Sequence, residues 1–314
     1  MKELLKQIED IKSLKIQGAT NVAKKGMEFF HDFCQRNEDL PKKKLFTELL
    51  KAKELIRTAR ATEPALRNGL QFVLNKLIKV KDNPDIHMAD YVTEYSKIYI
   101  DTIGKAKERI MEIGSERIPS SRKFSILTHC HSSVVTGILL KAKEQGKNDF
   151  QVFATETRPR YQGRITAQEL LDVGIKTTLV VDSAMRWVVR NYPIDMILIG
   201  ADAITSEGTV LNKIGSRLLA LVAREMHIPY YVATPLLKYN PESVFGTYEK
   251  IEMRDYTEIW PDKPELLKIK NPAFETVSRR YIDGLITEAG IFPAALISRV
   301  FYEQYPDLKP IGQF

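Results

Sequence analysis

The sequence has little cysteine, with only Cys34 and Cys130 among 314 residues. The two lie far apart and in different expected domains, show no metal-ligand spacing, and are not expected to form a disulfide in a reducing compartment. We therefore predict neither a disulfide framework nor a structural metal. This leaves Cys130 to be interpreted from its own neighbours.

Long apolar runs are also missing. No segment approaches the ~20 consecutive apolar residues of a membrane span, and the start, Met1–Gln7, is charged and helix-like without a signal-peptide core. These absences favour a cytoplasmic protein with no membrane partner. A hydrophobic content of 44% over 314 residues is enough for two domains with real cores.

Negative charge is in deficit, with 40 acidic against 47 basic side chains and a formal net charge of +7. This balance favours anionic ligands. The basic residues are widely spread, the densest cluster, Lys42–Lys44, is short, and no basic–aromatic interleaving of the RNA-binding kind occurs. We therefore favour a small phosphorylated molecule over nucleic acid. Neither G-x-G-x-x-G after the first strand nor G-x-x-x-x-G-K-[ST] is present, so no NAD or ATP cofactor is predicted.

Two patterns of apolar spacing divide the chain. Residues 1–114 carry apolar side chains at helical spacing, and residues 115–123 are short, polar and proline-containing, as in a linker. We predict an α/β protein with an all-helical N-terminal domain, 1–117, followed by a Rossmann-like, mostly parallel sheet domain, 118–314. The clearest helices expected in the first domain are Leu45–Thr58, Ala65–Val80 and Ala89–Ile113.

In the second domain short apolar runs alternate with helical segments, the pattern of a doubly wound parallel sheet. Strands are expected at Phe124–Leu127, Gln151–Ala154, Thr178–Val181, Met196–Ile199, Tyr230–Val232 and Gly284–Ile286. Helices are expected at Val134–Gln145, Ala167–Val173, Ala184–Arg190, Ile214–Met226 and Pro293–Tyr305. In such sheets ligands bind outside the carboxyl ends of the strands. The polar residues that follow each strand are therefore the candidate site.

Cys130 follows the first strand, between two histidines and just before a helix. A helix N-terminus and a nearby cation favour a thiolate, which can act as a base or a nucleophile. Two alternatives stay open: an inert buried cysteine, or the nucleophile of a Cys–His–Asp hydrolase. His129 and His131 have no third metal ligand at a recognisable spacing, so no metal site is predicted.

Asp202 follows the fourth strand, and a polar turn then leads to Asn212 and Lys213, which open the expected helix from Ile214. A carboxylate, an amide and an amine are therefore expected where small polar substrates bind. The alternative is that Asp202 caps the turn and Lys213 is a solvated lysine. Asp182 and Ser183 follow the third strand in the same way.

Arg158, Arg160 and Gln162 follow the second strand, where the arginine forks would suit a phosphate. Two helix starts in the first domain offer further anion sites. The stretch Gln17-Gly18-Ala19-Thr20 places a glycine and a hydroxyl at a helix start, where backbone N–H groups can hold an anion. Arg60 precedes the helix start marked by Pro64. Ordinary capping and solvation are the alternatives.

Eight motifs occur in order: Thr-His-Cys-His-Ser, Thr-Glu-Thr-Arg-Pro-x-x-Gln-Gly, Val-Asp-Ser-Ala, Gly-Ala-Asp-x-Ile, Asn-Lys-Ile-Gly, Ile-Glu-Met-Arg-Asp, Asn-Pro-Ala-Phe and Ile-Thr-Glu-x-Gly. Together they resemble the archaeal ribose-1,5-bisphosphate isomerases. That family belongs to a superfamily with methylthioribose-1-phosphate isomerase and the alpha, beta and delta subunits of eukaryotic initiation factor 2B.

The resemblance implies an aldose–ketose isomerase that converts ribose 1,5-bisphosphate to ribulose 1,5-bisphosphate without a cofactor. By matching positions, Cys130 corresponds to the catalytic base and Asp202 to the acid. The matching substrate contacts are Gly18, Ala19, Arg60, Arg158, Gln162, Asn212, Lys213 and Lys238. A homo-oligomer is also implied, either a dimer built through the sheet domain or a hexamer of three dimers.

Two related functions remain as alternatives: methylthioribose-1-phosphate isomerase, and a non-enzymatic regulatory subunit that binds a nucleotide or sugar phosphate. Regulatory relatives generally lack the cysteine, so Cys130 beside Asp202 favours an enzyme. The chain departs from the isomerase pattern at three expected pocket positions: Ser133 replaces a lysine, Pro235 a glutamate, and Ala61 a proline.

Overall fold

The computed structural model describes residues 1–309 apart from Gln17, Ala61 and Tyr248. Gln17 and Ala61, two positions considered above, therefore lie outside the described residues. Within them, no helix combines the length and the apolar composition needed to cross a membrane.

The chain divides into two compact units. Unit 1 contains Met1–Lys105, Leu237–Tyr239 and the described residues from Arg299 onward, and unit 2 contains Ala106–Leu236 and Asn240–Ser298. The division differs from the expected boundary at 117/118. It falls inside a single helix, α5 (Met88–Ser115), because Ile110 of that helix already belongs to the core around the sheet.

Unit 1 is helical, as predicted. Its helices are α1 (Lys2–Lys12), α2 (Ala19–Gln35), α3 (Lys42–Ala59), α4 (Pro64–Val80), the first part of α5, and most of α10 (Ile297–Gln304). The short segment Leu237–Tyr239 also belongs to this unit. It is held there by Asn68 on α4, whose side-chain amide donates to the carbonyls of Leu237 and Tyr239 at 2.8 and 2.9 Å.

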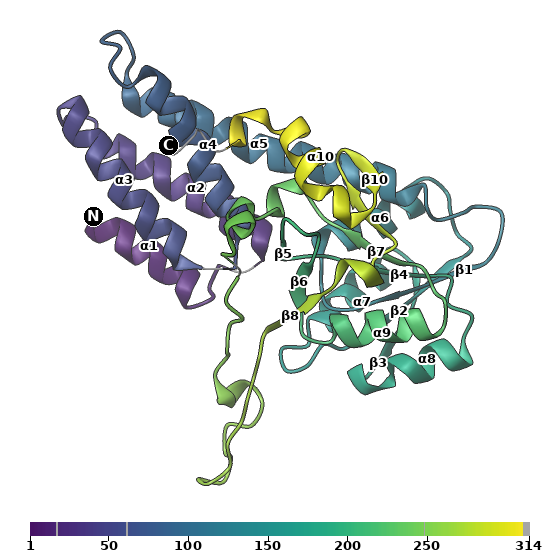
Figure 1. Ribbon diagram of the computed structural model, residues 1–314. Coiled ribbons are helices and arrows are strands. Elements are labelled where there is room, and N and C mark those ends of the chain that lie inside the picture. The colour runs from purple at the N-terminus through teal and green to yellow at the C-terminus, as the bar shows by residue number, and fades with distance from the viewer. Residues whose placement is uncertain (17, 61, 248, 310–314) are drawn as a thin grey trace. The chain divides into compact units, whose positions relative to one another are not determined.

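Unit 2 is built on a seven-stranded sheet with the order β10-β9-β7-β4-β1-β2-β3 (Figure 1). The six predicted strands are all present and all parallel: β1 (Phe124–Thr128), β2 (Phe150–Thr155), β3 (Lys176–Val180), β4 (Met196–Ile199), β7 (Tyr230–Ala233) and β9 (Gly284–Thr287). A short strand, β10 (Gly290–Phe292), adds to one edge in the antiparallel direction. The predicted Rossmann-like architecture is therefore confirmed.

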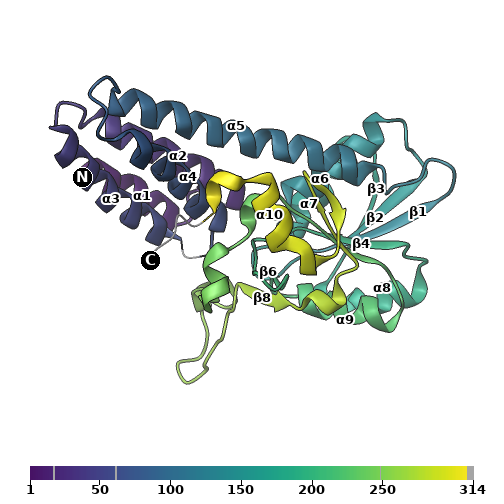
Figure 2. The same ribbon diagram turned by 45° about the horizontal axis from the view of Figure 1, so that its top comes forward.

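A helix lies in each connection between successive parallel strands from β1 to β7 (Figure 2). They are α6 (Ser133–Glu144), α7 (Gln162–Asp172), α8 (Met185–Asn191) and α9 (Ser216–Glu225). Helices α6 and α7 pack against each other, as do α8 and α9. Because crossovers are right-handed, the reversal of strand order between β1 and β4 sends these two pairs to opposite faces of the sheet. The carboxyl ends of β1 and β4 therefore meet at the point of reversal.

A second, three-stranded antiparallel sheet corrects one sequence prediction. Its strands are β5 (Ala203–Ile204), β6 (Val210–Lys213) and β8 (Phe274–Val277), in that order. Asn212 and Lys213 lie on β6 and do not open a helix, and α9 starts only at Ser216. The physical reason is a partner far along the chain, since Lys213 pairs with Phe274 across the ladder.

Candidate active site

Cys130 lies two residues beyond β1 in a left-handed backbone conformation, with φ at 69°. This conformation costs a non-glycine residue roughly 1–2 kcal/mol, so neighbouring contacts must hold it. The backbone N–H of Cys130 donates to the Thr157 hydroxyl at 2.9 Å, and the Thr166 hydroxyl donates to the Cys130 carbonyl at 3.1 Å. The loops after β1 and β2 are thereby tied together around the thiol.

Asp182 fixes the loop that holds Cys130. Its carboxylate accepts from the backbone N–H groups of Thr157 at 2.8 Å and of Arg158 at 2.7 Å. Thr157 in turn accepts from Cys130. The residue that follows β3 therefore positions the thiol through the β2 loop.

His129 is a buried neutral histidine. Its Nε2–H donates to the Ile214 carbonyl at 2.7 Å, and its Nδ1 lies 2.6 Å from the Thr155 hydroxyl. Burial lowers the pKa of His129, although the Ile214 carbonyl raises it in part. Gly215 permits this arrangement, because its φ is 106° and a Cβ there would lie 2.7 Å from the histidine Nε2. His129 therefore joins the β1 end to the start of α9.

Asp202 and Lys213 approach the thiol from the β4 end and the small sheet. The backbone N–H of Asp202 donates to the Leu211 carbonyl at 2.9 Å, which ties the two strand ends together. The Lys213 ammonium lies 4.7 Å from the centre of the Phe274 ring. Asn212 is buried, and its amide donates to the Ser216 hydroxyl at 2.9 Å.

Burial and two neighbouring charges act on the Cys130 thiol. Burial raises the pKa of its thiol to about 11, the Lys213 charge lowers the pKa, and the Asp202 charge raises it. The expected cation is present, but the loss of hydration outweighs it. Desolvation therefore opposes the thiolate that the helix start and the cation favour. The charges of Lys213 and Asp202 act on the thiol in opposite directions.

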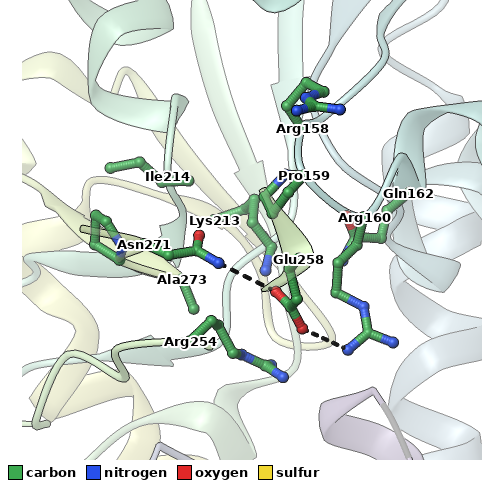
Figure 3. A pocket seen from close by; sticks show the side chains of 11 residues that line it. Arg158, Pro159, Arg160, Gln162, Lys213, Ile214, Arg254, Glu258, Asn271 and Ala273 are labelled. Carbon is green, nitrogen blue, oxygen red and sulfur yellow. Dashed lines mark hydrogen bonds and ion pairs between the residues drawn. The ribbon is translucent and has the colours of Figure 1, made fainter. Parts of the chain in front are cut away.

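A pocket lies beside Lys213 and includes Arg158 and Gln162, two further predicted residues (Figure 3). Glu258 lies near its centre and accepts from Arg160 at 3.1 Å and from the Asn271 amide at 3.3 Å. Arg158 points away from this carboxylate in Figure 3 and hydrogen-bonds to the Tyr161 hydroxyl, with its guanidinium 5.1 Å from that ring.

The other four predicted residues belong to unit 1. Gly18 precedes α2 with φ at 82°, and Ala19 is the buried first residue of that helix. Arg60 follows α3 in an extended conformation, with its Nε 3.5 Å from a Glu63 carboxylate oxygen. Lys238 ends a short 3-10 helix, Leu236–Lys238.

Of the expected residues, unit 2 therefore brings together Cys130, Asp202, Asn212 and Lys213, with Arg158 and Gln162 along the pocket. Among the described residues, no group of three or more His, Cys, Asp or Glu side chains could hold a metal ion.

Sequence comparison gives the family. The profile of the initiation factor 2 subunit family matches residues 15–294. The chain belongs to that family. Within the initiation factor 2 subunit family it is 34% identical to the ribose 1,5-bisphosphate isomerase of Archaeoglobus fulgidus, over 97% of this chain and 94% of that protein. It is 33% identical to the methylthioribose-1-phosphate isomerase of Acetivibrio thermocellus, over 80% and 76%.

A solved structure of the family gives the same fold. The translation initiation factor eIF-2B of Pyrococcus horikoshii OT3 superposes with a TM-score of 0.78 at 29% identity, over 93% of this chain and 98% of that one. The family resemblance seen in the eight motifs is confirmed by these findings.

Three pocket residues were not predicted from the sequence: Arg254, Glu258 and Asn271. The signal was present, since Arg254 and Asn271 belong to the motifs Ile-Glu-Met-Arg-Asp and Asn-Pro-Ala-Phe. The structure brings the motifs together by a bridge between Met253 and Pro272 and by a hydrogen bond from the Arg254 N–H to the Asn271 carbonyl at 2.8 Å.

Proposed function

We propose that the chain is an aldose–ketose isomerase that converts ribose 1,5-bisphosphate to ribulose 1,5-bisphosphate. The observation that carries this proposal is that Cys130 and Asp202 follow the adjacent strands β1 and β4 at the carboxyl edge of the parallel sheet, where the Lys213 charge also acts on the thiol. A thiol and a carboxylate beside a cation supply one group to remove a proton, one to donate a proton, and one to stabilise negative charge. The relatives named as ribose 1,5-bisphosphate isomerases support the choice of substrate.

The chemistry needs an acid and a base together, because the 1-phosphate prevents spontaneous opening of the sugar ring. Cys130 takes the proton from C2, the electrons form a C1–C2 double bond, and the bond from C1 to the ring oxygen breaks. Asp202 gives a proton to that oxygen. The resulting enol then loses its O2 proton and gains one at C1, which gives the ketone at C2.

The scheme needs Cys130 as the thiolate and Asp202 as the acid when the sugar reacts. Lys213 favours the thiolate, because its charge lowers the pKa of the thiol. Asp182, Thr157 and His129 act by positioning, since each one holds a loop around Cys130.

Methylthioribose 1-phosphate is the second candidate substrate, favoured by the 33% identical relative that bears its name. It undergoes the same chemistry but carries an apolar thioether in place of one phosphate. The segment Pro235–Leu237 is apolar, as a slot for the thioether requires, but all three residues are buried in the structure. The cationic pocket beside Lys213 is better matched to a second phosphate.

The test is to incubate purified protein separately with ribose 1,5-bisphosphate and methylthioribose 1-phosphate and to follow ketose formation. We expect ketose from the bisphosphate and none from a folded Cys130→Ser variant, because a serine hydroxyl is too weakly acidic to act as the base. Ketose from the thioether sugar alone would select the second candidate. No ketose from either would favour a non-enzymatic regulatory protein.

A further inference from the structure

The pocket of Figure 3 has an excess of positive charge. Among the described residues, Arg158, Arg160, Lys213 and Arg254 line it, against a single carboxylate, Glu258. Arginine forks bind planar or multivalent anions, and phosphate offers three acceptor oxygens. Such a lining is suited to an anion that carries more charge than one carboxylate.

Arg254 is placed in the pocket by backbone pairing. Its N–H donates to the Asn271 carbonyl, and the Ala273 N–H donates to the Glu252 carbonyl at 2.8 Å. The loop segments 252–254 and 271–273 therefore lie side by side. The Arg254 side chain is only 10% exposed, with its Nε 3.1 Å from Glu252. A guanidinium presents five N–H donors in a planar fork, a geometry suited to a multivalent anion.

Glu258 occupies the place where that anion would bind. Its carboxylate lies between Arg160, Arg254 and Lys213 in Figure 3, with one oxygen on Arg160 and the other on Asn271. The side chains of Arg160 and Glu258 are 32% and 21% exposed, so the pair is accessible to a competing anion. Glu258 also belongs to a long irregular segment, between Gly246 and Phe274, that extends away from both sheets (Figure 1).

Lys213 connects the pocket to the reacting groups. The same ammonium lines the pocket and lowers the pKa of the Cys130 thiol. A sugar phosphate with its reacting carbons beside Cys130 and Asp202 could therefore extend a phosphate past Lys213 into the pocket.

We propose that this pocket binds one phosphate group of the substrate through Arg160 and Arg254, and that Glu258 is an internal counter-ion which the phosphate displaces from Arg160. The identity of the sugar rests on the proposed function. The pocket itself rests on the placement of its charges. Either the 1-phosphate or the 5-phosphate has the required chemistry, and the experiment separates the two.

The test measures dissociation constants by calorimetry in the Cys130→Ser background, where binding is observed without turnover. The ligands are ribose 1,5-bisphosphate, ribose 1-phosphate and ribose 5-phosphate. We expect Arg160→Gln and Arg254→Gln each to weaken bisphosphate binding by roughly tenfold or more, because each removes charged hydrogen bonds. Glu258→Gln should tighten it by about three- to tenfold, because the competing charge is gone. The monophosphate that shows the same changes identifies which phosphate enters the pocket.

Matched controls lie outside the pocket. Arg224→Gln on α9 and Glu265→Gln on the same long segment as Glu258 remove exposed charges and should leave all three affinities within about twofold. Arg160→Lys keeps the charge without the fork and should weaken binding less than Arg160→Gln. Melting temperatures confirm that each variant is folded.

Two results would overturn the proposal: unchanged affinities in both arginine variants, or weaker bisphosphate binding in Glu258→Gln, which would make Glu258 a support for Arg160. Failure of the proposed function gives a different set of results from failure of the pocket proposal. In that case the unsubstituted protein forms no ketose, while the calorimetric pattern of the pocket variants is as expected.

Discussion

The protonation state of Cys130 can be measured directly through its reaction with iodoacetamide, because only the thiolate reacts. With a pKa of about 11 the thiol is about 0.1% ionised at pH 8, against roughly a quarter for an ordinary cysteine. Ionisation alone should therefore make alkylation about 200-fold slower than that of free cysteine at pH 8. The logarithm of the rate should rise with unit slope and show no plateau below pH 10.

The assay uses a Cys34→Ser background, so that Cys130 supplies the whole signal. Cys34 also has a raised thiol pKa, of about 12, because it is buried, so its slow alkylation would otherwise overlap that of Cys130. Mass spectrometry of the intact chain follows the addition of one carbamidomethyl group, and circular dichroism at each pH confirms that the fold persists. The pH dependence separates ionisation from steric protection, which lowers the rate equally at every pH.

Two neighbouring substitutions should act in opposite directions. Lys213→Gln removes the charge that lowers the Cys130 pKa, so alkylation at a given pH should become slower. Asp202→Asn removes a charge that raises the pKa, so alkylation should become faster. A plateau with its midpoint below pH 9 in the unsubstituted site, or a faster reaction in Lys213→Gln, would refute the reasoning.

Three further predictions concern catalysis, stability and assembly. Asp202→Asn should lower kcat by ~10²–10⁴ with little change in substrate affinity, because the amide keeps a hydrogen bond but supplies no proton; near-normal turnover would remove its role as the acid. Gly215→Ala should lower the free energy of unfolding in urea by about 2 kcal/mol or more, through backbone strain and contact with His129, whereas Gly174→Ala, at φ 73° with open space, should cost less. Equal losses in the two variants would argue against the His129 contact. Light scattering should show a dimer or larger assembly, consistent with the exposed Ile291 on edge strand β10, and a monomer at micromolar concentration would contradict this.

Buried parallel strands are the part of this fold that a single sequence predicts well. Met196–Ile199 has the same bounds in the sequence prediction and in the structure, because four apolar residues between turn signals suit a buried strand. The strand Val210–Lys213 shows the limit. Half of it is polar, and its partner, β8, lies some sixty residues further on, so no local pattern distinguishes it from the start of a helix.

The candidate site, like the fold, was predicted where it depends on the parallel strands and missed where it depends on loop contacts. Parallel topology places all the strand ends that carry polar residues at one edge of the sheet, whereas the pairing of β1 with β4, which makes Cys130 and Asp202 follow adjacent strands, is seen only in the structure. The raised pKa of Cys130 could not be predicted from the sequence, because the hydration lost by a thiol depends on atoms from many segments. The pocket carboxylate Glu258 was missed because a loop–loop bridge at Met253 places it, and loop pairing has no periodic signal in the sequence.

The candidate reacting residues come from the sheet, whereas two residues of the candidate phosphate pocket come from a loop, and this difference bears on how substrate specificity can change. Cys130 and Asp202 follow adjacent strands, β1 and β4, whose spacing is set by backbone hydrogen bonds. Arg254 and Glu258 come from a long loop that this ladder does not constrain. On the proposed function, insertions or exchanges in that loop alter which end-group a sugar must carry, while the spacing of Cys130 and Asp202 stays the same. Transplanting residues 249–271 from a relative of different substrate range is accordingly a direct route to changing specificity without rebuilding the chemistry.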